Sequence, residues 1–138
     1  MRPISATLAV VISLSIAFLR AKSCTLTSQY TVYIVSNLPP NTPMLSTHCW
    51  SRDDDLGSHT LAPGQNYNFN FCESAEGSTK FTCRLWWNGK DKTFDVFSSS
   101  WTFEPCDKTG TCNWFAKEDG IYFSNRNPPW KLQKVYPW

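Results

Sequence analysis

The sequence predicts an all-β fold, an antiparallel β-sandwich of about seven to eight short strands stabilised by disulfides. Three observations favour this class. Short stretches rich in β-branched and aromatic residues recur between turn signals. No stretch after residue 23 shows a sustained helical period. Finally, six cysteines in a chain of 138 residues are typical of small disulfide-bonded domains.

The first 23 residues have the composition of a secretory signal peptide. Met1 and Arg2 form a short positive start, and residues 8–19 form an apolar run interrupted only by serines. Ala21 and Ser23 supply small side chains at positions −3 and −1 of a cleavage point after Ser23, with cleavage after Ala21 as the second choice. The run is short against the ~20 residues that span a bilayer. We therefore expect a signal peptide at 1–23, an extracellular domain at 24–138 and no membrane insertion after cleavage.

The charge of the mature domain argues against nucleic-acid binding. The whole chain has 13 basic and 11 acidic residues, a formal net charge of +2. Arg2, Arg20 and Lys22 lie in the predicted signal peptide, and removing them leaves 10 basic residues against 11 acidic ones. A net charge near −1 provides no basic field for a phosphate backbone.

The strands follow from alternation and turn residues. They are expected over residues 30–37, 45–51, 59–61, 67–72, 79–87, 93–97, 112–118 and 121–124, with a brief extended segment at 101–103. Asn88-Gly89 predicts a type I′ hairpin turn. Asp119-Gly120 predicts a second two-residue turn, which would pair Glu118 with Ile121. Trp130 in the tail is expected to pack back on the sandwich, and the last residues to fray.

The directions of the side chains constrain the disulfides. Cys49, Cys83 and Cys112 share the apolar faces of their strands, whereas Cys106 lies in a loop. Cys24 and Cys72 are both peripheral, so we predict that they pair. The other four can pair in three ways, of which Cys49–Cys112 with Cys83–Cys106 is one. Zinc is disfavoured, because the closest spacing, Cys106 to Cys112, has no histidine nearby.

Several motifs together resemble the plant self-incompatibility protein family, also called S-protein homologues. They span nearly the whole mature chain: Val35-Ser-Asn-Leu38, the His48-Cys to Leu-Gly57 segment, Leu61-x-Pro-Gly64, Phe69-x-Phe71, Thr79-x-Phe-x-Cys83, Cys106 and Cys112 with Trp114, and Asp119-Gly-Ile-Tyr-Phe123. The resemblance implies a secreted β-sandwich that acts as an extracellular ligand, without a cofactor, and is not an enzyme. The family's four usual cysteines match Cys49, Cys83, Cys106 and Cys112, with Cys24 and Cys72 extra.

The resemblance also implies recognition of hydrophilic loops by a cell-surface receptor. The stretch 48–61 fits that role, since Cys49 anchors it and three adjacent carboxylates must stay in water, where each avoids a desolvation cost of several kcal/mol. We expect a monomer read through loop tips at 52–57, 73–78, 88–92 and 104–110, which should split between the two ends of the sandwich. The nominated contacts are Arg52, Asp53, Asp54, Asp55, Glu76, Asn88, Lys90, Asp91, Asp107 and Lys108.

Four other interpretations of the sequence have weaker support than an extracellular ligand. The acid triplet lacks the alternating spacing of a calcium loop, so a solvated turn is favoured and no metal is expected. His48 and His59 could act as an acid and base on RNA, but catalytic residues are not expected, because the motifs of secreted ribonucleases are missing. A redox or cysteine-protease role is disfavoured, because paired cysteines offer no thiolate. A lectin-like module is the main alternative, with an aromatic platform drawn from Trp86, Trp87, Trp101 or Trp130.

Overall fold

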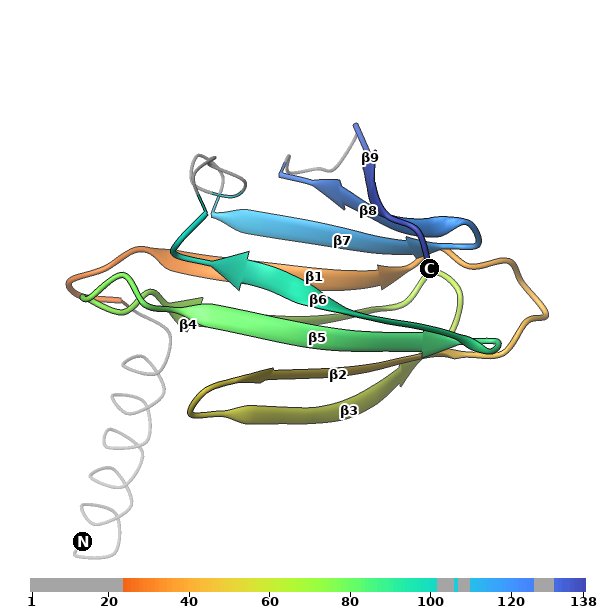
Figure 1. The fold of residues 1–138 in the computed structure, drawn as a ribbon, viewed down its shortest axis with the longest axis horizontal. Coiled ribbons are helices and arrows are strands. Elements are labelled where there is room, and N and C mark those ends of the chain that lie inside the picture. The colour runs from red at the N-terminus through yellow and green to blue at the C-terminus, as the bar shows by residue number, and fades with distance from the viewer. Residues whose placement is uncertain (1–23, 102–105, 107–109, 126–130) are drawn as a thin grey trace, which may run out of the picture.

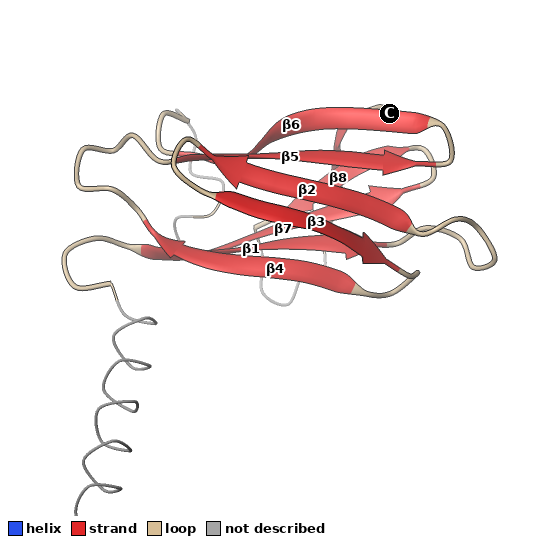
Figure 2. Ribbon diagram, turned by 90° about the horizontal axis from the view of Figure 1, so that it is seen from below, coloured by secondary structure: helices blue, strands red, loops and turns tan. Residues whose placement is uncertain are grey.

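The computed structural model describes residues 24–101, 106, 110–125 and 131–138, and the predicted signal peptide lies outside them. Two sheets stack face to face (Figures 1 and 2). Their nine strands are β1 (Gln29–Ser36), β2 (Leu45–Ser51), β3 (Asp55–Leu61), β4 (Asn66–Cys72), β5 (Lys80–Trp87), β6 (Lys90–Ser98), β7 (Thr111–Lys117), β8 (Gly120–Ser124) and β9 (Gln133–Tyr136). In the described part of the chain, no helix is long and apolar enough to cross a membrane.

The predicted all-β sandwich is confirmed, with one parallel pair that alternation could not reveal. One sheet has the order β4-β1-β7-β8-β9 and the other the order β3-β2-β5-β6. β1 and β7 run parallel, and every other neighbouring pair is antiparallel. Strands that follow one another in the chain run in opposite directions, so their connections lie at the two ends of the sandwich. We call these the N-terminal end, where Cys24 lies, and the C-terminal end, where Trp138 lies.

The core is built from the inward-facing positions of both sheets. Val32 and Ile34 of β1 are completely buried, as are Leu45 of β2 and Leu85 of β5. Side chains on alternate positions of a strand share one face, and here the apolar set faces the other sheet. The two-residue turn at Asn88-Gly89 has the positive φ angles, 49° and 79°, that type I′ geometry requires.

The disulfide pairing agrees only in part with the pairing named in the sequence analysis. Cys24 pairs with Cys72 as predicted, but the other bridges are Cys49–Cys83 and Cys106–Cys112. The pairings Cys49–Cys112 and Cys83–Cys106 are therefore wrong. The reason is strand order: β2 and β5 are neighbours, and their register places Cys49 opposite Cys83.

Two connections also differ from their predicted form. β3 begins at Asp55 rather than near residue 59, because the positive φ of Gly57, 79°, forms a bulge inside the strand and does not end it. In the last hairpin Ala116 pairs with Ile121, so the turn residues are 118 and 119 instead of 119 and 120. Because this change of register is even, the predicted inner face is preserved.

The end of the chain does not fray as predicted. β9 pairs with β8, and the ring of Tyr136 lies 5.1 Å from that of Phe94 across the sandwich. The indole N–H of Trp138 donates to the carbonyl of Lys117 at 2.7 Å. This segment therefore closes the flank between β6 and β8. The predicted contact of Trp130 lies outside the described residues.

Candidate recognition surface

The nominated loops are divided unequally between the two ends. The β2–β3 turn, the β4–β5 loop and the segment around Cys106 and Gly110 lie at the N-terminal end, whereas the Asn88-Gly89 turn lies at the other. Asp107 and Lys108 fall outside the described residues. The N-terminal end is thus where nominated residues from distant parts of the chain gather.

The β2–β3 turn is held by its own backbone and by Ser51. The amide of Ser51 donates to the carbonyl of Asp54 at 2.8 Å, and the amide of Asp54 donates to the Ser51 hydroxyl at 3.1 Å. Arg52 and Asp53 form a loose ion pair, 3.6 Å between Nε and Oδ1, with most of each side chain exposed. The turn therefore presents Asp53 and Asp54 to solvent on a fixed backbone.

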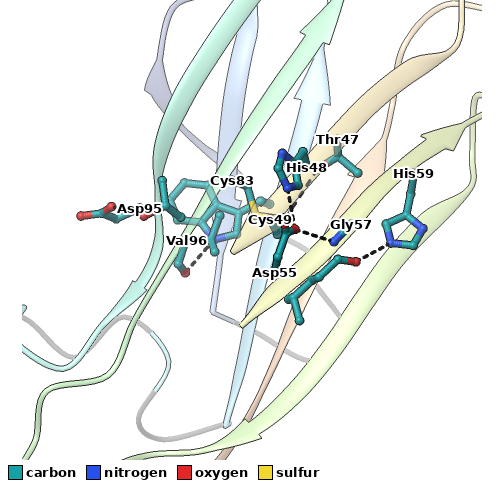
Figure 3. Close-up of a disulfide and its surroundings, with 12 residues drawn as sticks. Thr47, His48, Cys49, Asp55, Gly57, His59, Cys83, Asp95 and Val96 are labelled. Atoms are coloured by element: carbon teal, nitrogen blue, oxygen red, sulfur yellow. Dashed lines mark hydrogen bonds and ion pairs between the residues drawn. A yellow bond between two sulfur atoms is a disulfide. The ribbon is translucent and has the colours of Figure 1, made fainter. Parts of the chain in front are cut away.

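Asp55 has a different role from the two acids before it. Its carboxylate accepts the amide of Gly57 at 2.9 Å and lies 2.7 Å from Nε2 of His48 (Figure 3). The hydrogen bond from Gly57, and next the one from His48, lower the pKa of Asp55 below its ordinary value. The nominated Asp55 thus fastens the start of β3, and 70% of its side chain stays exposed, so its role as a contact stays a prediction.

The β4–β5 loop is also internally ordered. The Ser74 amide donates to the hydroxyl of Thr79 at 2.8 Å, and the Ser78 amide donates to the hydroxyl of Ser74 at 2.9 Å. The Ser99 hydroxyl donates to the carboxylate of Glu73 at 2.6 Å, which joins this loop to the segment after β6. The nominated Glu76 lies exposed at the tip of the loop.

A cleft of about 690 Å³ separates the turn from the loop. Arg52, Asp53 and Asp54 of the turn form one wall. The other wall comes from the ends of β4 and β5 and their connection: Phe71, Cys72, Ser74, Ser78, Thr79, Lys80, Phe81 and Thr82. Trp50 and Ser51 complete the lining, and they pair with Thr82 and Phe81 in the ladder between β2 and β5. The turn wall therefore carries two carboxylates and one guanidinium, and the other wall combines aromatic rings with hydroxyl groups and one lysine.

Most of the second wall was missed from the sequence. Phe71 and Phe81 lie on inward faces of their strands, so alternation assigns them to the core, and their rings do contact each other at 4.5 Å. Phe71 nevertheless stays only half-buried, because no element covers the flank next to β4. No local signal in the sequence identifies a core residue that borders a cleft.

The nominated residues at the C-terminal end are engaged in internal contacts. Nζ of Lys90 donates to the carbonyl of Glu118 at 2.8 Å and lies 5.5 Å from the ring centre of Trp87. Asp91 accepts three hydrogen bonds from the guanidinium of Arg84, which hold the pKa of Asp91 below its ordinary value. Asn88 is exposed in its turn.

The two histidines do not share a site. His48 faces outward beside Trp50, with ring centres 5.1 Å apart. His59 is opposite the buried Thr47 in the ladder, so it faces inward, and it stacks on Tyr67 at 3.9 Å. Because they lie on opposite faces of one sheet, they are not placed to act as an acid and base on one phosphate.

The tryptophans nominated for a sugar platform also lie apart. Trp86 is on the outer face of β5 beneath the guanidinium of Arg84, 4.5 Å from the ring centre. Trp87 is buried, with its N–H donating to the carbonyl of Pro43 at 2.9 Å. Trp101 contacts Phe97, and Trp130 lies outside the described residues. Within the described ranges, no group of three or more His, Cys, Asp or Glu side chains could hold a metal ion.

The fold, the three disulfides and the loop surface define a class: small disulfide-bonded β-sandwich proteins. Residues 31–138 match the family model described as plant self-incompatibility protein S1. The chain therefore belongs to the plant self-incompatibility protein family, whose members are small secreted plant proteins.

Individual relatives agree with this assignment. The chain is 36% identical to S-protein homolog 29 of Arabidopsis thaliana over 107 residues, 78% of this chain and 76% of that one. It is 40% identical to S-protein homolog 11 of the same plant over 100 residues, 69% of this chain and 67% of that one. A solved structure of a self-incompatibility protein homologue superposes with a TM-score of 0.56 at 18% identity, covering 83% of this chain and 94% of that one, so it supports the fold.

Proposed function

We propose that this chain is an extracellular signalling ligand, recognised as a monomer by a receptor protein on the surface of a plant cell. The observation that carries the proposal is the gathering of fixed polar loops around one cleft at the N-terminal end, with Asp53 and Asp54 on its turn wall. A ligand of this kind binds through its shape and charge and performs no chemistry. Membership of a family of small secreted plant proteins supports the location.

The fixed geometry of the loops supports recognition because binding then costs less conformational entropy. The Cys49–Cys83 bridge joins β2 to β5 beneath the turn, and the Cys24–Cys72 bridge fixes the end of β4. Each side chain immobilised on binding costs roughly 0.5–1.5 kcal/mol, so a surface that is already ordered loses less affinity. Exposed carboxylates such as Asp53 and Asp54 would mainly steer association.

The experiment is cell binding with the oxidised, fluorescently labelled mature protein. Saturable binding to plant cells is expected, and treating the cells with protease should abolish it. The double variant Asp53→Asn and Asp54→Asn should bind at least several-fold more weakly, because the acidic wall is lost. Glu118→Gln is the matched control, because it removes one exposed charge at the opposite end.

Three outcomes would contradict the proposal. Binding that is never saturable would argue against a receptor. Binding that survives protease but is lost after polysaccharide hydrolases would favour the lectin-like alternative. RNA cleavage that disappears in His48→Ala or His59→Ala would indicate an enzyme.

A further inference from the structure

The four edge strands of the sandwich differ in how they are protected. Free strand edges expose backbone donors and acceptors, and proteins block unwanted pairing with bulges, charges, prolines or short lengths. The bulges of three edges lie at Leu56-Gly57 in β3, at Val96 in β6 and at Val135 in β9. β4 pairs with β1 in seven consecutive positions without a bulge, and it contains no charge and no proline.

The other edges carry further protection, which in β6 consists of lysine and aspartate side chains along the strand. In β3 the Asp55 carboxylate accepts the Gly57 amide, and the His59 ring donates to the carbonyl of Leu56 at 3.1 Å. β9 has only four residues, includes Lys134 and is followed by a proline. Among the described strands, β4 is therefore the edge best suited to accept another strand.

The backbone groups at the free edge of β4 can be assigned from the ladder. Antiparallel partners alternate between hydrogen-bonded and non-hydrogen-bonded pairs. The amide of Glu73 donates to the carbonyl of Ser28, and the amide of Ser36 donates to that of Gln65, both at 2.9 Å. These bonds make Ser28 with Glu73 and Ser36 with Gln65 hydrogen-bonded pairs. Because pair types alternate between these two, residues 67, 69 and 71 also form hydrogen bonds to β1. The N–H and C=O groups of residues 66, 68, 70 and 72 then point away from β1.

The side chains of β4 fit an added strand. Tyr67, Phe69 and Phe71 point inward, yet all three are half-buried, because the flank between β3 and β4 is uncovered. Two clefts border this flank. The cleft already described lies at the N-terminal end, and another of about 720 Å³ lies toward the C-terminal end, lined by Ser58, His59, Thr60, Leu61, Gln65, Asn66 and Tyr67.

We propose that an extended peptide segment of the receptor adds to β4 as a sixth strand of that sheet. This inference rests on the proposed function and specifies the binding mode. Backbone hydrogen bonds to residues 66, 68, 70 and 72 provide affinity. Apolar side chains at alternate positions of the segment cover Tyr67, Phe69 and Phe71, and a lysine or arginine of the segment meets Asp53 and Asp54 across the cleft.

Charge favours a basic segment over a second copy of this chain. Two antiparallel β4 strands would pair uncharged residues with each other and bring no cation to the acidic wall. Lys80, the lysine in the cleft lining, lies within 4.0 Å of Asp95. Arg52 is already 3.6 Å from Asp53. Among the described residues, Asp54 is then the acid of the cleft lining without an ion pair, and a basic residue of the segment would supply one where a second β4 would not.

A proline substitution separates strand addition from loop binding. The amide of Asn68 is assigned to the free edge, so Asn68→Pro removes one edge donor without removing a β1–β4 hydrogen bond. Asn68→Ala is the matched control, because it removes the same exposed side chain and keeps the amide. On plant cells, Asn68→Pro should bind at least tenfold more weakly than the wild type, and Asn68→Ala should bind within about twofold, consistent with loss of a ladder bond.

A defined peptide provides the second measurement and does not require the receptor. The probe is an eight-residue peptide with alternating valine and threonine after an N-terminal lysine. In an antiparallel arrangement, its lysine reaches the end of β4 beside the acidic wall. Amide hydrogen exchange read by NMR should slow at residues 66, 68, 70 and 72 when this peptide binds. A peptide with glutamate in place of the lysine should bind several-fold more weakly.

Each outcome separates this inference from the proposed function. If wild type and Asn68→Pro bind cells equally and exchange at β4 is unchanged by peptide, strand addition is wrong although the receptor role stands. If cells show no saturable binding but the peptide protects β4, the receptor role fails and the edge site remains. Concentration-dependent dimers that vanish in Asn68→Pro would assign the edge to a second copy and overturn the inference. So would binding of cell-wall oligosaccharides at β4 without amide protection. If Asn68→Pro does not fold, the exchange measurement on the wild type decides.

Discussion

Cys49 and Cys83 lie directly opposite each other on β2 and β5, with their Cα atoms 4.0 Å apart, and their disulfide joins two neighbouring strands of one sheet. The bridge closes a sequence separation of 34 residues, whereas Cys106–Cys112 closes one of only 6. Loop-closure entropy therefore makes the first bridge the stronger constraint on the unfolded chain.

The first prediction concerns the rank of these two bridges. Replacing Cys49 and Cys83 together with alanine should lower the free energy of unfolding by about 4 kcal/mol, against about 2 kcal/mol for Cys106 and Cys112, from loop-closure entropy. Guanidinium denaturation of the two double variants measures both values. A larger loss at Cys106 and Cys112 would contradict this ranking. Non-reducing peptide mapping of the wild type should recover Cys49 linked to Cys83.

The second prediction concerns the flank closed by β9. Tyr136→Ala removes ring contacts with Phe94 and Trp114 and should cost about 2–3 kcal/mol of unfolding free energy, less than the ~3–5 kcal/mol of a fully buried aromatic ring, because this ring is half-buried. The control is Val135→Ala in the same strand, whose side chain is exposed. It should change the free energy of unfolding by less than about 0.5 kcal/mol. Equal effects of the two substitutions would show that β9 does not seal the core.

A third prediction concerns Gly120, where β9 passes close to β8. A Cβ atom at this position would lie 2.5 Å from the carbonyl oxygen of Tyr136, so Gly120→Ala must displace β9. Hydrogen exchange in β9 should accelerate at least tenfold. Gly64→Ala is the control, because it also has a positive φ, 87°, but has open space around its Cα. If both variants leave exchange in β9 unchanged, the close approach is not a constraint.

The fourth prediction concerns acid stability. The hydrogen bonds from Gly57 and His48 lower the pKa of Asp55 in the folded protein, and those from Arg84 do the same for Asp91. An aspartate whose pKa is lower in the folded than in the unfolded protein stabilises the fold at pH values above its unfolded pKa of about 3.9, and this stabilisation is lost as the pH falls through the folded pKa. The guanidinium concentration at the denaturation midpoint should therefore decrease when the pH is lowered below about 4, and this decrease should be smaller in Asp55→Asn. Asp53→Asn removes a neighbouring charge without those hydrogen bonds and should leave the slope unchanged. A midpoint that is constant from pH 5 to pH 2 would contradict the prediction.

Local patterns predicted the strands and their inner faces, because alternation depends only on neighbouring residues. They did not predict which strands lie side by side. For that reason the Cys24–Cys72 pair, inferred from two peripheral cysteines, is confirmed, while the bridge between Cys49 and Cys83 needed the order of β2 and β5. The short β9 has no alternation of polar and apolar residues that would predict it. From the sequence Gly120 is expected to be a turn residue, and only the structure shows that Tyr136 lies against it.

Only part of the candidate recognition surface could be predicted from the sequence. The acidic turn could be nominated because three adjacent carboxylates must stay in water, and the structure places Asp53 and Asp54 beside a cleft. The opposite wall could not be nominated. Phe71 and Phe81 have the pattern of core residues, and their position beside an uncovered flank depends on which strands form the edges of the two sheets.

Because Trp138 docks at the end of the molecule remote from the turn between β2 and β3 (Figure 1), the site of attachment determines how the protein is presented. A short flexible tether after Trp138 would display the cleft beside Asp53 and Asp54 away from a support. The same tether ahead of Cys24, which is fastened to Cys72 in the lining of that cleft, would turn it toward the support. If the proposed receptor reads this end, protein immobilised through its C-terminal end should capture the receptor and protein immobilised ahead of Cys24 should not.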